Sequence, residues 1–113
     1  MANKHTTLVI KDVRSGKILV DAQSEHFAEI EGNWYVDPSA VRTDVLQMTQ
    51  HEYTCPYKGR CHYVDFADGS ERQQRVAWVY DDVKPGWEHI RGKYAFYAGA
   101  TARKFGKTLD EVI

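Results

Sequence analysis

The sequence of 113 residues has no apolar run long enough to cross a bilayer as a helix, which takes about 20 residues. Its first residues, Met1 to His5, lack the apolar stretch of a signal peptide. Its charges nearly cancel, with 15 Lys and Arg against 16 Asp and Glu. Because nucleic-acid and membrane-surface proteins usually carry a clear basic excess, we expect neither partner. These absences predict a cytoplasmic protein.

Repeats, linkers and low-complexity stretches are also absent, and no helical periodicity runs long enough to suggest a helix bundle. The length allows one domain, which can bury a core without a metal or a disulfide. We expect a single domain over residues 1–113, with its core at about 7–98. Short apolar segments separated by turn residues favour a mostly β fold of two packed antiparallel sheets, with seven or eight strands and one or two short helical turns.

Three turns carry the prediction of hairpins: Arg14-Ser15-Gly16, Glu31-Gly32-Asn33 and Asp68-Gly69. Between the first two turns, Ile18 and Val20 are expected on one face of a strand, with Leu19 and Asp21 on the other. A helical turn is expected at Asp37-Pro38, with aspartate as its cap. A second short helix is expected at 108–113, because Thr108 to Glu111 matches a capping box.

The most distinctive segment runs from Thr54 to Tyr63 and reads TCPYKGRCHY. Upstream of it stand Trp34-Tyr35 and DVL at residues 44–46, and downstream stand AWVY at residues 77–80 and YAFY at residues 94–97. This series, in this order, resembles a bacterial family of unknown function, domain family 427, over about residues 8–97. Where members of that family often carry alanine, this chain has Cys61, which weakens the case for Cys61 as a required group.

The resemblance implies a β-tent fold, in which two antiparallel sheets lean together. Relatives of that architecture include zinc-binding chaperone-like proteins and ligand-binding domains with aromatic cages. The family has also been labelled nucleotidyltransferase. That chemistry needs carboxylates clustered around Mg²⁺. However, Asp81 and Asp82 are adjacent and should diverge on a strand, and the chain has no glycine-rich phosphate loop.

Metal and redox chemistry are not favoured by the cysteine spacing. Cys55 and Cys61 have five residues between them, and no second cysteine pair exists. Cys61 and His62 are neighbours and should face opposite sides of a strand. We therefore expect no metal and no cofactor, and buried reduced thiols rather than a disulfide. A nucleophile formed by Cys55 with His51 or His62 stays open as an alternative.

The aromatic residues form the leading candidate site. Val76, Trp78 and Tyr80 are expected on one face of a strand and Ala77 and Val79 on the other, and because both faces are apolar we expect a central, buried strand. The turn at residues 56–59 is expected to hold a tyrosine and a lysine beside a cleft. The candidate ligand-binding residues are Trp34, Tyr35, Cys55, Tyr57, Lys58, Tyr63, Trp78 and Tyr80. No catalytic residue is assigned.

The sequence thus favours a binding module for a small molecule or a modified peptide, with rings for stacking and Lys58 for an anionic group. An enzyme that uses a cysteine or acts on phosphate esters is the alternative, and a structural or regulatory interaction protein is the third. Residues 91–107 hold five basic residues and no acidic one, which indicates either a solvated face or a weak anion-binding patch. The ligand and the oligomeric state stay open.

Overall fold

The computed structural model describes residues 6–113, so the expectation about Met1 to His5 lies outside the described residues. Nine strands, one short α-helix and three 3-10 turns make up this part of the chain. The strands are β1 (Thr7–Asp12), β2 (Ile18–Gln23), β3 (Phe27–Ile30), β4 (Asn33–Val36), β5 (Leu46–Cys55), β6 (Gly59–Ala67), β7 (Arg72–Val83), β8 (Tyr94–Tyr97) and β9 (Thr108–Val112). The helix is α1 (Gly99–Phe105), and the 3-10 turns are η2 (Ser24–His26), η3 (Pro38–Ala40) and η4 (Glu88–Ile90).

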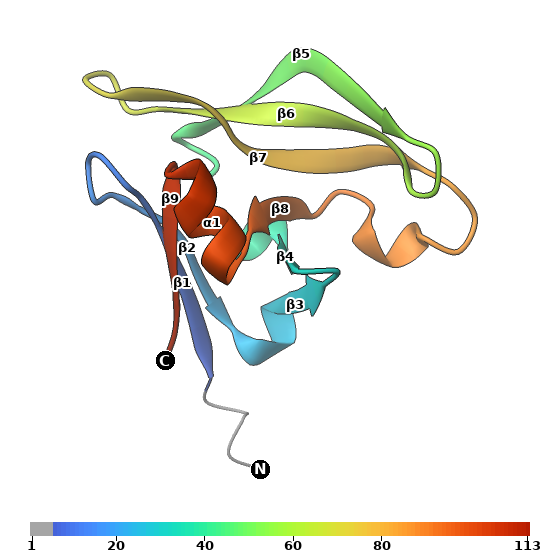
Figure 1. The fold of residues 1–113 in the computed structure, drawn as a ribbon, viewed down its shortest axis with the longest axis horizontal. Helices are drawn as coiled ribbons and strands as arrows, with labels where there is room; N and C mark the ends of the chain where they lie inside the picture. Colours follow the sequence, from blue (N-terminus) through green and yellow to red (C-terminus); the bar gives the residue numbers. More distant parts are fainter. Residues whose placement is uncertain (1–5) are drawn as a thin grey trace.

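The strands form two antiparallel sheets, as predicted (Figure 1). The smaller sheet has the order β2-β1-β9, and the larger has the order β3-β4-β8-β7-β6-β5. In Figure 1 the long strands β5, β6 and β7 lie across the top, and α1 stands in front, between β9 and β8. No helix in residues 6–113 is long and apolar enough to cross a membrane.

The main core lies between the two sheets. It joins Leu8, Ile10 and Leu19 of the smaller sheet to Val64 and Phe96 of the larger one, all of them fully buried. A second apolar cluster covers the opposite face of the larger sheet, where it includes residues of β4, β6, β7 and η4. The larger sheet is therefore apolar on both faces at its centre. Because β7 lies inside this sheet, the prediction that it is a central, buried strand is confirmed.

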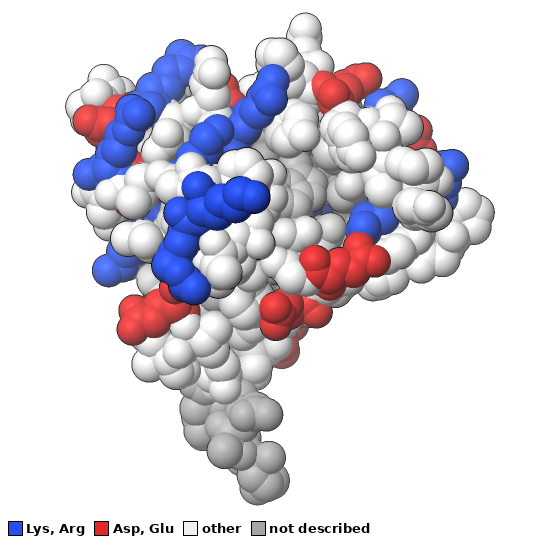
Figure 2. Space-filling view, in the orientation of Figure 1, with Lys and Arg blue, Asp and Glu red and all other residues white. Residues whose placement is uncertain are grey.

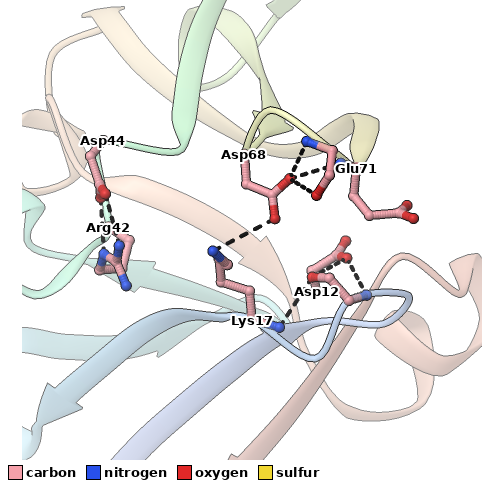
Figure 3. Close-up of polar contacts among 8 residues, drawn as sticks. Asp12, Lys17, Arg42, Asp44, Asp68 and Glu71 are labelled. Carbon is pink, nitrogen blue, oxygen red and sulfur yellow. Dashed lines mark hydrogen bonds and ion pairs between the residues drawn. The ribbon is translucent and has the colours of Figure 1, made fainter.

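The three predicted turns are all present between paired strands. An ion pair joins two of these turns, because Lys17, which follows the β1–β2 turn, lies 3.6 Å from Asp68 of the β6–β7 turn (Figure 3). Asp68 also accepts the backbone N–H groups of Glu71 and Ser70, which lower its pKa from 3.8 to about 2. This one carboxylate shapes the β6–β7 turn and ties it to the smaller sheet.

The C-terminal segment differs from the prediction. Residues 108–112 form strand β9 rather than a helix, because they pair with β1 along the open edge of the smaller sheet. The only α-helix in residues 6–113 is α1, which precedes them. Asp110 of β9 accepts a hydrogen bond from the indole nitrogen of Trp34 at 2.7 Å and another from the backbone nitrogen of Gly99 at 2.8 Å. Backbone pairing and these contacts outweigh the local capping signal.

Three smaller expectations were also wrong. The structure has more strands than predicted, since β5 is a largely polar edge strand with weak sequence signals. Ile18 is exposed while Leu19 and Val20 are both buried, because a bulge in the β1–β2 pairing breaks the simple alternation. The 3-10 turn η3 begins at Pro38 as expected, but Asp37 does not cap it with its side chain. That carboxylate pairs instead with Lys93 and with His26.

Candidate functional site

The second apolar face is assembled by strand register. Across four neighbouring strands, Tyr35 lies opposite Ala95, Ala95 opposite Trp78, and Trp78 opposite Tyr63. Residues directly opposite each other in antiparallel strands point to the same face of the sheet. This row therefore brings residues far apart in the sequence onto one surface.

A second row lies two residues further along β7 and β6 and continues onto β5. Tyr80 is opposite Cys61, and Cys61 is opposite Tyr53. At the other end of the first row, Asn33 is opposite Tyr97. Side chains two residues apart on a strand share a face, so these residues join the first row on one side of the sheet.

The rows enclose a hollow of about 260 Å³. Its lining contains five tyrosines and no carboxylate: Asn33, Tyr35, Tyr53, Lys58, Cys61, Tyr63, Trp78, Tyr80 and Tyr97. Within it the rings of Trp78 and Tyr97 have centroids 4.8 Å apart at an interplanar angle of 56°. Tyr97 in turn stacks on Phe105 of α1, with centroids 4.4 Å apart and planes 10° apart. The aromatic surface thus continues from the hollow to the half-exposed ring of Phe105.

Four tyrosines of the hollow are held as neutral phenols by burial. Burial raises the pKa of Tyr35, Tyr63, Tyr80 and Tyr97 above the ordinary value of 10.0. Nearby cations oppose this rise in part: Lys58 acts on the pKa of Tyr35, and Arg75 acts on the pKa values of Tyr63 and Tyr97. A neutral phenol can both donate and accept a hydrogen bond, so the lining offers polar atoms of both kinds beside flat rings.

Within residues 6–113, Lys58 is the only cationic side chain in the lining of the hollow. Its ammonium pairs with the carboxylate of Glu31 and lies 4.9 Å from the ring centroid of Trp87. Burial lowers the pKa of Lys58. The hydrogen bond to Glu31 and the nearby negative charges together raise it by more, so the pKa of Lys58 lies above its ordinary value. The lysine is therefore protonated, and the carboxylate of Glu31 balances its charge. Only 15% of its side chain is exposed, so the lysine lies along the protein surface rather than in bulk water.

The turn that carries Lys58 depends on Gly59. This glycine has a φ of 123°, and a Cβ atom placed on it would lie 2.1 Å from the carbonyl oxygen of Asp82. Only a residue without a side chain allows β6 to approach β7 this closely. The predicted turn over residues 56–59 is present, and the close approach of its last residue places Lys58 against the hollow.

Cys55 lies under the same turn. Its sulfur accepts a hydrogen bond from the backbone nitrogen of Lys58 at 3.4 Å. Burial raises its pKa, but the backbone N–H groups of Lys58 and Tyr57 more than offset this, and the pKa is lowered from 9.0. Burial instead raises the pKa of Cys61 to about 11. Neither cysteine is in a disulfide.

The structure does not bring a histidine to Cys55. His51 is exposed on β5, and the hydrogen bonds of the described residues include none between it and the Cys55 sulfur. His62 lies between two carboxylates, with Glu52 at 3.1 Å and Asp81 at 3.0 Å. The pairing expected for a cysteine nucleophile is therefore not formed in this structure.

Five of the eight predicted site residues line the hollow, and three do not: Trp34, Tyr57 and Cys55. Trp34 follows the strand alternation onto the opposite face, where it packs in the main core against Phe27. Tyr57 is at the tip of the turn with 75% of its surface exposed. Cys55 is buried in the same apolar cluster, under the turn.

Four lining residues were not predicted: Asn33, Tyr53, Cys61 and Tyr97. Each is two residues from another member of the same face, namely Tyr35, Cys55, Tyr63 and Ala95. The period-two rule for strands was the available signal, but it cannot be applied between strands until their register is known. Tyr53 had a further obstacle, because the polar sequence of β5 does not look like a strand.

The acidic residues considered for nucleotidyl transfer are held in separate ion pairs. Asp81 lies 3.0 Å from His62, and Asp82 lies 3.3 Å from Arg60. Across residues 6–113, no cluster of three or more His, Cys, Asp or Glu side chains is arranged to hold a metal ion. In this part of the chain, Asp81 and Asp82 therefore belong to no such cluster.

Comparison with curated proteins gives no significant match. A family model described as a domain of unknown function (DUF427), with the short name NTP_transf_9, matches residues 4–107. The match covers nearly the whole chain, from before β1 to the residue that precedes β9. The chain therefore belongs to the DUF427 family.

Proposed function

We propose that this chain is a binding domain for a small molecule and that the ligand occupies the hollow lined by Trp78 and the five tyrosines. The observation that carries the proposal is the convergence of these rings, from strands that are distant in sequence, around a space that no side chain fills. Binding sites are typically concave, apolar and aromatic, with a few polar groups that orient the ligand.

The size of the hollow limits the ligand. Its volume of about 260 Å³ is below the roughly 300 Å³ at which sites for drug-sized ligands begin. A ligand with one or two rings fits this space, and a modified peptide would have to place a single side chain or chain end in it. Flat rings bury a large area at little cost in conformational entropy, so the site is suited to stacking.

A thermal-shift screen of one- and two-ring compounds tests the proposal. At a ligand concentration about 100 times Kd, binding stabilises the native state by about 2.7 kcal/mol, which raises Tm by roughly 10 °C. Each compound that raises Tm is then tested on Tyr53→Ala, which opens the lining at a half-exposed ring, and on Tyr57→Ala.

Tyr57→Ala is the matched control, because it is the same substitution on the same hairpin outside the hollow. We expect affinity to fall in Tyr53→Ala and to stay unchanged in Tyr57→Ala. The proposal fails if no compound raises Tm, or if the two variants lose affinity equally.

A further inference from the structure

Arg75 has a backbone conformation that is costly for its residue type. Its φ is 55°, a left-handed value that only glycine adopts freely, and it occurs within strand β7. The residue belongs to a bulge, since the pairing of β6 with β7 shifts register between Val64 and Phe66. Its backbone N–H donates to the carboxylate of Asp65 at 3.0 Å, which holds the strained conformation in place. Bulges beside functional sites often redirect a side chain.

The redirected side chain lies beside the hollow. The guanidinium carbon of Arg75 is 5.1 Å from the ring centroid of Tyr63, which is part of the lining. Among the described residues, no carboxylate lies within ion-pair distance of this guanidinium. Lys58, which lines the hollow, is in contrast neutralised by Glu31. Arg75 is thus a cation that contacts the site and keeps its hydrogen-bond donors available.

A second cation stands next to Arg75. The ammonium of Lys107 donates to the backbone carbonyl of Gln74 at 2.6 Å. Burial and then the charge of Arg75 lower the pKa of Lys107, which shows that the two cations are close. Lys and Arg side chains gather over the α1 side of the molecule (Figure 2). With no carboxylate in its lining, the hollow lies in a region that favours negative charge.

We propose that the ligand is a planar aromatic compound bearing an anionic group, such as an aryl carboxylate, and that Arg75 binds that group. This inference rests on the proposed function, because it assigns a chemical class to the ligand of the same hollow. The rings take the flat part of the ligand, and the guanidinium offers a planar pair of donors suited to a carboxylate. A cationic ligand is disfavoured, because its charge would face Arg75 with no acidic group in the lining to compensate.

The test compares three probes of similar size on the intact protein: indole-3-carboxylate, indole-3-carboxamide and phenyltrimethylammonium. Binding is followed by the aromatic NMR signals of Trp78 and Tyr97. We expect the carboxylate to bind about tenfold more tightly than its amide, because a hydrogen bond to a charged group is stronger than a neutral one. The quaternary ammonium should bind more weakly than either.

Substitution then tests the role of Arg75. In Arg75→Gln the preference for the carboxylate over the amide should disappear, and in Arg75→Lys part of it should return. Arg72→Gln is the matched control, because Arg72 is on the same strand and pairs with Asp65 outside the hollow. It should keep the preference of the unaltered protein.

Arg75→Gly separates a binding role from a structural one. Glycine relieves the strain at a φ of 55°, so the Tm of this variant should be no lower than that of the unaltered protein, while the carboxylate preference is lost. A lower Tm with the preference retained would show that Arg75 only supports the fold and would overturn the inference.

The probe series also keeps the two proposals distinct. If the amide or the ammonium binds in the hollow as tightly as the carboxylate does, the assigned ligand class is wrong while the proposed function stands. If none of the probes perturbs the signals of Trp78 and Tyr97, and the wider screen finds no ligand, both proposals fail.

Discussion

The substitution Gly59→Ala tests the close approach of β6 to β7 beside the hollow. The new methyl group would lie 2.1 Å from the carbonyl oxygen of Asp82 and 2.9 Å from the Cα atom of Val83. Both are backbone atoms of the neighbouring strand, so no side-chain rotation can relieve the contact. The turn or the β6–β7 pairing has to move.

The expected cost has two parts. An alanine at a φ of 123° costs about 1–2 kcal/mol, because this region favours glycine. Forcing the two strands apart costs a further 1–3 kcal/mol or so, as overpacking does in protein cores. We therefore expect Gly59→Ala to lower the free energy of unfolding by about 2–5 kcal/mol, a large share of the roughly 5–15 kcal/mol that a domain has in total.

Gly69→Ala is the matched control, since Gly69 has a φ of 96° and a Cβ atom there would meet nothing within 4 Å. It should cost only the conformational part, about 1–2 kcal/mol. Urea unfolding followed by tryptophan fluorescence gives both values, and an m-value of about 2 kcal/mol/M converts the difference between the variants into a midpoint shift of about 1 M. Equal midpoints for the two variants would refute the close approach of β6 to β7.

Three further predictions concern other parts of the fold. Asp110→Ala removes the carboxylate that accepts the indole N–H of Trp34 at 2.7 Å and the backbone N–H of Gly99, at the start of α1, at 2.8 Å. It should lower the free energy of unfolding, measured in urea, by about 2–4 kcal/mol. Its exposed neighbour gives the control, Glu111→Ala, and a similar cost for both variants would contradict this role. In the native protein iodoacetamide should alkylate Cys55 before Cys61, as mapped by mass spectrometry. Backbone N–H groups lower the pKa of Cys55, while burial raises the pKa of Cys61 to about 11. Alkylation in the reverse order would refute this. A hydrogen-bonded lysine and histidine lower the pKa of Asp37 below its ordinary 3.8, so its contribution to stability is present above about pH 4 and is lost as the pH falls through the native-state pKa. Between about pH 5 and pH 3 the urea midpoint should therefore fall less in Asp37→Asn than in the unaltered protein, and an identical fall would count against the ion pair.

Much of the fold follows from local sequence signals. The turns at Arg14-Ser15-Gly16, Glu31-Gly32-Asn33 and Asp68-Gly69 are set by residues that adopt turn conformations cheaply, and all three join paired strands. Alternation along β7 correctly separates Trp78 and Tyr80 from Ala77 and Val79, because side chains on a strand point to opposite sides in turn. It was wrong for Val76, which packs in the main core, because the shift in the β6–β7 pairing next to it breaks the alternation. These features depend only on neighbours in the chain.

The C-terminus shows where such signals fail. Thr108 to Glu111 carries the pattern of a helix start, yet this segment is a strand. Its state depends on the free edge of β1, whose unpaired backbone groups are satisfied by β9. Similarly, β5 is a strand because it completes the edge of the larger sheet, although most of its residues are polar and exposed. Pairing with a distant strand overrides weak local preference.

The sequence by itself determined the fold class, the hairpin turns and the turn at residues 56–59 that carries Lys58. Only the tertiary structure decided which rings meet. Register across β4, β8, β7, β6 and β5 brings Tyr53 and Tyr97 into the hollow, and alternation within β4 turns Trp34 away from it. The physical reason is that register is set by hydrogen bonds and packing between strands far apart in the chain, and a shift of one residue would reverse every side chain.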